Sequence, residues 1–405
     1  MSWGSLLAGG ITAYLVVVRF LRYNRRDEII RQYCPEGRRS LGRLSLENAH
    51  KIVLDLATLE FPAVFSGSIF FALFKTYGIP SISSVLVSTR QLSASSTASK
   101  RAADTGILIT EVVLNPPCSG RVIDGVARMN YLHGSYRKSG KITDDDMLYT
   151  LGLFALEPIR WTAKYDWRSL TDVEKCALGV FWKDMGEAME ISYDQLQPFL
   201  SLEFDDGLAW LDALQEWCDQ YETAHMVPAV SNRDVSKATL DIAVFNIPVR
   251  LRKLAVKAVA AILEPRLQKA MMMDEPPAIY SLVISHILRL RRNFVRYMCL
   301  PRPQWLRTQW FTDEKDRETG RYHPLRYIAH PWYMKPSLFS RWGPNALLTR
   351  LYGGVLPGDQ GTTYHPEGYL ISELGPSALV GKGLQEMNMT RTELGKRRGC
   401  PIPRF

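Results

Sequence analysis

Apolar residues recur at helical spacing through most of the first 300 residues of this 405-residue chain. Thr143, followed by three aspartates, has the composition of a helix N-terminus, and Pro158 is expected to kink or end the helix that starts there. Thr171 and Glu174 have the spacing of a capping box. Further helices are predicted over 207–226, 233–245, 249–273 and 279–298. Convincing period-two runs are few, so we predict an all-α protein with a single helical body.

The N-terminal segment is uncharged from Trp3 to Val18 and is then strongly basic. Including Phe20 and Leu21, with Arg19 extending to the interface, brings it close to the roughly 20 residues that span a bilayer. The basic residues follow the apolar run, whereas a cleaved signal peptide carries them before it. We therefore predict that residues 1–22 form a single-pass anchor, with the rest of the chain on the cytosolic side. A helix packed on its own domain is the alternative.

Two further regions raise the question of membrane contact. The apolar run 61–80 is interrupted by small and polar residues and lacks a basic flank, which favours a buried core helix over a second span. The stretch 287–307 interleaves arginines with aromatics, which fits either an anionic membrane surface or a solvated helix face. Residues 23–300 are expected to form the helical core. Residues 301–405, rich in Pro, Gly and aromatics, are expected to form a loop-rich extension packed on it.

The charge balance favours an anionic partner. The chain has 50 Lys and Arg against 41 Asp and Glu, a formal net charge of +9. No zinc finger, basic heptad region or aromatic-basic strand motif is present, so membrane lipid is the predicted partner and nucleic acid is not. The six cysteines are scattered without a CxxC pair, and we interpret them as reduced thiols.

The candidate site is built around one histidine. His133 continues a helical row formed by Val122, Val126 and Met129, so it lies on an apolar face. A histidine in such a place is more often structural than a ligand, although imidazole is also the commonest metal ligand. On the preceding helical stretch, Arg101 and Thr105 are four residues apart with Asp104 between them, so a cation, a carboxylate and a hydroxyl are expected to converge. An apolar gap between two such helices suits a flat hydrophobic cofactor such as haem, with one axial imidazole.

Other familiar motifs are absent. The stretch 375–383 has the wrong spacing for a phosphate loop, and the sequence contains no GxGxxG, HExxH or GxSxG. His323, His330 and His365 each precede a proline and lie in extended or turn backbone. They would bind a metal together with His133 only if the tail folded back over the helices, which leaves a non-haem metal oxygenase as a weaker hypothesis.

Several stretches resemble a known family. They are "LEFPAVFSGSIFFALFKTYGIPSIS" from Leu59, "KRAADT" from Lys100, "YLHGSYRKSGKITDDDMLYTLGLFALEPIRW" from Tyr131, and "RWGPNALLTR" with "PGDQGTTYHPEGY" in the tail. They are similar to fungal ER-bound oxygenases of the mycophenolic acid pathway type, which share a catalytic domain with bacterial rubber oxygenases. The resemblance implies a globin-like helical core, haem b with O2 as co-substrate, and a location in the endoplasmic reticulum membrane. It also implies oxidation or cleavage of a C=C bond in an apolar prenyl or terpenoid chain, in secondary metabolism.

The resemblance also assigns residues. It places the proximal haem ligand at His133 and the distal arginine and threonine at Arg101 and Thr105. The distal lysine of the bacterial proteins falls on Asp104, where a carboxylate would move protons or repel an anionic oxygen species. A second bacterial histidine falls near Gly152, which cannot bind a metal. A non-catalytic, membrane-associated lipid- or terpenoid-binding protein, in which His133 is structural, is the remaining alternative.

Overall fold

A computed structural model describes residues 3–89, 95–200 and 205–398, which form helices joined by loops. Within these ranges there are eighteen α-helices and no β-strand, and extended segments pair only at two isolated bridges. The predicted all-α class is confirmed.

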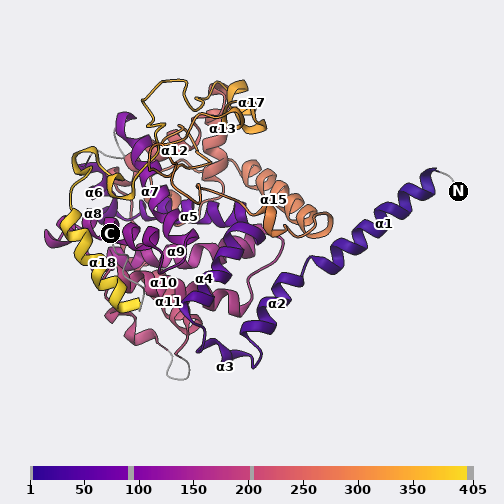
Figure 1. The fold of residues 1–405 in the computed structure, drawn as a ribbon, viewed down its shortest axis with the longest axis horizontal. Coiled ribbons are helices and arrows are strands. Elements are labelled where there is room, and N and C mark those ends of the chain that lie inside the picture. Colours follow the sequence, from indigo (N-terminus) through magenta and orange to yellow (C-terminus); the bar gives the residue numbers. More distant parts are fainter. Residues whose placement is uncertain (1–2, 90–94, 201–204, 399–405) are drawn as a thin grey trace.

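The body of the molecule is a set of helices packed around one hydrophobic core (Figure 1). It comprises α4 (Leu46–Asp55), α5 (Pro62–Thr76), α7 (Ser95–Leu114), α8 (Gly120–Lys138), α9 (Asp144–Tyr165), α10 (Asp172–Ala188) and α11 (Gly207–His225). The helix α5 lies along α9, α10 packs between α4 and α11, and α7 packs against α8. The N-terminus of α9 is capped as predicted, since the Thr143 hydroxyl accepts a hydrogen bond of 3.0 Å from the Asp146 amide.

Shorter helices surround this body. They are α2 (Asn24–Tyr33), α3 (Arg38–Leu41), α6 (Pro80–Ser88), α12 (Val230–Ala243), α13 (Val249–Ala260), α14 (Pro265–Ala270), α15 (Ala278–Met298), α16 (Leu338–Trp342), α17 (Pro344–Leu351) and α18 (Leu384–Arg398). Of these, α12 and α15 follow predicted ranges within three residues.

Proline explains two differences from the predicted helices. The helix α9 continues past Pro158 to its end at Tyr165, so the expectation that this proline could end the helix is wrong. Pro158 is buried in the core, where packing along α5 holds the turn together. The single helix predicted over 249–273 is instead two, because Pro265 begins a new helix at its first position.

The N-terminal helix α1 (Trp3–Leu21) projects away from the body, with the N-terminus at its far end (Figure 1). In the described part of the chain, the continuous helical run Trp3–Tyr33 is the one helix long and apolar enough to cross a membrane by itself. The other apolar run forms α5, which meets the preceding helical segment at 112°. Many side chains of α5 are buried in the body, including those of Phe71 and Lys75. The helix α5 is therefore a core helix.

The C-terminal part is mainly irregular and is held to the body by buried side chains. Arg128 on α8 is fully buried, and its guanidinium donates hydrogen bonds of 2.8–2.9 Å to the carbonyls of Leu374, Leu379 and Lys382. Three charge-assisted hydrogen bonds from one side chain hold this largely irregular segment, which contains only a short 3-10 turn (Ser377–Leu379), against α8.

The five cysteines that the structure describes are of two kinds, and Cys400 lies outside the described residues. Four of the described cysteines are free thiols: Cys34, Cys176, Cys218 and Cys299. Cys118 takes part in a disulfide, so the expectation of reduced thiols is wrong at this position.

Candidate functional site

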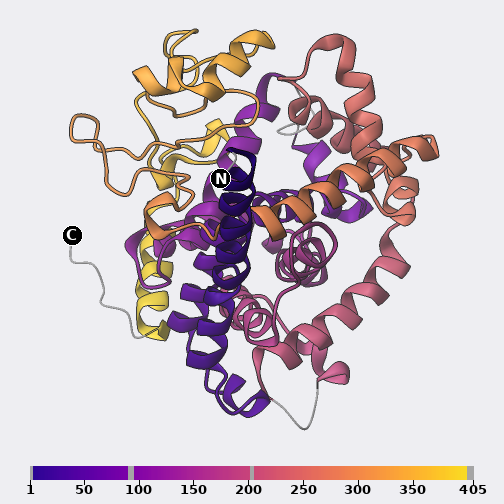
Figure 2. The same cartoon turned by 90° about the vertical axis from the view of Figure 1, so that its right-hand side faces the viewer.

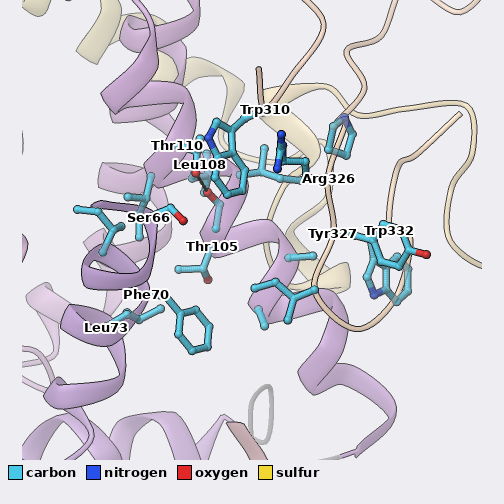
Figure 3. A pocket seen from close by; sticks show the side chains of 18 of the residues that line it. Ser66, Phe70, Leu73, Thr105, Leu108, Thr110, Trp310, Arg326, Tyr327 and Trp332 are labelled. Carbon is cyan, nitrogen blue, oxygen red and sulfur yellow. Dashed lines mark hydrogen bonds between the residues drawn. The ribbon is translucent and has the colours of Figure 1, made fainter. Parts of the chain in front are cut away.

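A cavity of about 1490 Å³ lies between the helical body and the C-terminal segment. Ordinary small-molecule sites measure roughly 300–1,000 Å³, so this one has room for more than a single compact ligand. Figure 3 shows Phe70 and Leu73 of α5 and Thr105 of α7 on its wall, with Trp310 and Tyr327 of the C-terminal segment also lining it. Apolar side chains dominate the lining, which suits an apolar ligand.

His133 on α8 lines this cavity. Its Nδ1 atom is enclosed without a hydrogen-bond partner, although buried ring nitrogens are normally bonded. Burial lowers the pKa of His133 to about 4, and the nearby charges of Arg101 and Arg137 act in the same direction. The imidazole is therefore neutral at physiological pH and has a nitrogen lone pair available for a ligand.

Arg101 and Thr105 on α7 line the same cavity and bind each other. The Arg101 Nη1 atom donates a hydrogen bond of 2.9 Å to Thr105 Oγ1, which itself donates to the Arg101 carbonyl, also at 2.9 Å. Burial lowers the pKa of Arg101, and the charge of Asp104 is the largest influence that opposes this effect. Among the described residues, no carboxylate forms an ion pair with the guanidinium. Because a buried cation is normally paired, this arrangement favours an electronegative group in the cavity.

Asp104 does not line the cavity, so the expected convergence of carboxylate, cation and hydroxyl is not seen. It is fully buried, and its Oδ2 accepts hydrogen bonds from Lys100 Nζ (2.7 Å) and the Gly375 amide (3.0 Å). Its Oδ1 accepts a hydrogen bond of 2.7 Å from the Tyr333 hydroxyl. Neighbouring residues of a helix point about 100° apart. For this reason Asp104 faces the C-terminal segment while the next residue, Thr105, faces the cavity.

Gly152 lies on α9 where it packs against α11, and it is not among the cavity residues. A Cβ atom at this position would lie 2.5 Å from Cys218 Sγ. A histidine would therefore not fit here unless α11 moved, so this chain has no equivalent of the second bacterial histidine at that place.

Nδ1 of each tail histidine has a local partner, although the buried Nε2 of His323 has no hydrogen-bond partner. His323 and His330 line the cavity; His323 Nδ1 lies 2.9 Å from the Tyr333 carbonyl, and His330 Nδ1 lies 2.7 Å from Ser99 Oγ. His365 is exposed, with Nδ1 3.0 Å from the Glu367 carboxylate. Across residues 3–89, 95–200 and 205–398, no three His, Cys, Asp or Glu side chains gather as a metal site would require.

Sequence reasoning missed the contribution of the C-terminal segment to the cavity. Trp310, Tyr327 and Trp332 lie on its wall, but they come from irregular stretches that have no periodicity to indicate a buried face (Figure 3). For these three aromatic residues, the sequence offered only the general expectation that the tail packs on the helices.

Comparison with known proteins identifies the family. No protein-family model matches the chain. The chain is 38% identical over 403 residues to the ER-bound oxygenase mpaB' of Penicillium brevicompactum, an alignment that covers 99% of this chain and 95% of that protein. It is 37% identical over 366 residues to the ER-bound oxygenase mpaB of the same species, covering 90% and 86%. It is 40% identical over 273 residues to the ER-bound oxygenase mpaB of Penicillium roqueforti, covering 67% and 91%. The chain therefore belongs to the family of fungal ER-bound oxygenases of the mpaB type.

Proposed function

We propose that this protein is a membrane-anchored, haem-dependent oxygenase that uses O2 to cleave a C=C bond in a long apolar prenyl or terpenoid chain. The observation that carries the proposal is the neutral, unpaired imidazole of His133 on the wall of a large apolar cavity, together with the unpaired guanidinium of Arg101. Membership of an oxygenase family supplies the reaction class.

The ligand set favours haem over a non-haem metal. A porphyrin supplies four iron ligands itself, so one protein imidazole is sufficient, whereas non-haem iron oxygenases use two histidines and a carboxylate. The described residues offer His133 but no group of three candidate ligands. His133 would thus hold the haem iron. A bound haem would supply O2 binding and the electron chemistry.

The remaining cavity residues have separate roles in this proposal. Thr105 holds the Arg101 guanidinium against the cavity, where a fixed positive charge stabilises negative charge that develops on oxygen as O2 is reduced. The apolar walls keep water away and bind the hydrocarbon chain. Asp104 acts outside the cavity, where it holds Tyr333 and Gly375 of the C-terminal segment in place.

The proposed reaction needs no external reductant, because O2 adds across the double bond and each new carbonyl keeps one oxygen atom. The test is incubation of detergent-solubilised protein with a farnesylated phenol under 18O2, with borohydride present to reduce each new carbonyl before its oxygen exchanges with water, followed by mass spectrometry. Two fragments, recovered as alcohols with one 18O atom each, are expected from the wild type and the His330→Ala control but not from His133→Ala. An intact chain, or fragments without 18O, would refute the proposed reaction.

We also propose a single-pass location in the endoplasmic reticulum membrane with the body in the cytosol. The uncharged length of α1, its exposed side chains and the basic residues that follow it support this topology. A glycosylation acceptor placed before Trp3 should be glycosylated in cells, since the N-terminus would be lumenal. Absence of glycosylation, with protease-protected body helices, would contradict this orientation.

A further inference from the structure

The helix α15 has its apolar side exposed. None of its 21 residues is buried. Apolar side chains recur along it at three- and four-residue steps and are all exposed: Ile279, Leu282, Val283, Ile287, Leu290, Phe294 and Tyr297. The side that meets the body carries Ile284, Leu288, Arg291 and Val295, which are partly buried, and Arg291 donates to the Tyr165 carbonyl (3.3 Å) and pairs with Asp166 (3.6 Å). A helix on a water-exposed surface rarely carries so long a row of exposed apolar side chains in addition to its packed side, so something apolar covers this row.

Neighbouring helices extend this apolar surface. On α16 and α17, Leu338, Phe339 and Leu351 are 84%, 79% and 76% exposed. On α13, Val249 and Leu251 are exposed as well. Figure 1 shows α15 on the side of the body from which α1 projects, with α13 and α17 at the top of the body, and Figure 2, viewed from that side, shows α15 beside α1. We call the exposed side chains of α13, α15, α16 and α17 the apolar face.

The apolar face is continuous with the N-terminal anchor. The Tyr14 hydroxyl, within the uncharged part of α1, donates a hydrogen bond of 2.9 Å to the Met298 carbonyl at the end of α15. After the uncharged run, Arg25 donates a hydrogen bond of 2.7 Å to the Arg302 carbonyl. If α1 spans the bilayer, these contacts bring the end of α15 to the bilayer surface, at a depth typical of interfacial helices.

The charge of these helices also matches a membrane. The four helices of the apolar face contain ten Lys and Arg residues and no Asp or Glu. Such a surface is attracted to anionic headgroups. A second copy of the chain would instead bring two equally basic faces together, so lipid is the better occupant.

The cavity reaches the surface within this face. Phe339, Leu348 and Tyr352 line the cavity and are also 79%, 50% and 48% exposed, so they form the rim of an opening at α16 and α17. We propose that the apolar face docks into the lipid bilayer and that the cavity opens there, which admits a lipid-dissolved ligand directly from the membrane. Docking of the apolar face into the bilayer does not depend on the proposed function, whereas the identity of the ligand does.

The test places a reporter on the apolar face of the full-length protein. A fluorescent coumarin amino acid replaces Leu290 of α15 or Leu351 of α17, and exposed Glu216 on α11 is the matched control position. Each variant is reconstituted as one copy per nanodisc of phosphatidylcholine with phosphatidylserine. Quenching by brominated acyl chains is then compared with quenching by aqueous iodide, and far-UV circular dichroism checks the fold.

Docking predicts several-fold stronger quenching by brominated lipid at positions 290 and 351 than at 216, and the reverse order with iodide. Iodide quenching at 290 and 351 equal to that at 216 would overturn the proposal, because the face would then be in water. Protection from both quenchers would also overturn it, since the chain itself would cover the face. Neither readout needs haem or turnover, so failure here is distinct from failure of the proposed function.

Discussion

Replacing Asp104 with asparagine tests whether this residue is structural, as its contacts indicate, or part of the cavity chemistry. The Asp104 carboxylate accepts three hydrogen bonds, from Lys100, Tyr333 and the Gly375 amide. Hydrogen bonds to a charged group contribute roughly 1.5–3 kcal/mol, against about 0.5–1.5 kcal/mol for neutral pairs. A loss of about 1 kcal/mol per bond lowers the free energy of unfolding of Asp104→Asn by about 3 kcal/mol.

The assay is urea unfolding of the full-length protein in detergent, followed by circular dichroism at helical wavelengths. The control is Asp241→Asn, because Asp241 forms an i,i+4 pair with Lys237 of the same type as Asp104 with Lys100, but on the surface. That exposed pair is expected to contribute less than about 0.5 kcal/mol. If Asp104→Asn were as stable as the wild type but had lost haem or activity, the carboxylate would belong to the cavity chemistry and the reasoning would be refuted.

Three further predictions follow from other buried groups. Arg101→Met should leave the free energy of unfolding unchanged or higher, because the substitution removes an unpaired buried charge. Its O2-dependent turnover should fall about 100-fold. Turnover equal to that of the wild type would exclude the proposed electrostatic role. The free energy of unfolding should fall as the pH drops from 6.5 towards 4. Burial lowers the pKa of both His50 and His133 to about 4, so in this pH range only the unfolded chain takes up their protons. If the free energy of unfolding of His133→Asn depended on pH as steeply as that of the wild type, this would argue against a neutral buried imidazole. Gly152→Ala should cost about 1–3 kcal/mol in urea unfolding, because its Cβ would lie 2.5 Å from a cysteine sulfur on α11; a wild-type value would show that α9 and α11 pack loosely.

Local signals in the sequence were enough for much of the fold. The N-cap at Thr143 and the capping box at Thr171 start helices where they were predicted. Each of these caps joins residues only a few positions apart in the chain, so the local sequence is enough to predict it. Prolines were harder to interpret, since Pro158 stays inside a helix and Pro265 starts one. The difference comes from packing against distant helices, which local sequence does not contain.

The candidate site was predictable only in part. Helical spacing places His133 and Arg101 on one cavity, as expected for neighbouring helices. The orientation of Asp104 depends on Tyr333 and Gly375, which are 229 and 271 residues away in the chain, so no pattern around Asp104 indicates it. For the same reason, the amphipathic pattern over 279–298 predicts a helix but does not tell which side faces the protein.

The most direct test of the central claim is the haem content of the purified full-length protein, measured by absorption spectrum and pyridine haemochrome assay. The comparison is between wild type, His133→Ala and His330→Ala, because both histidines line the cavity but only His133 has an unpartnered buried Nδ1. The account predicts one haem b per chain in the wild type and in His330→Ala, and none in His133→Ala. A folded wild type that stays colourless after supply of haem, or a His133→Ala variant with the wild-type spectrum, would contradict it.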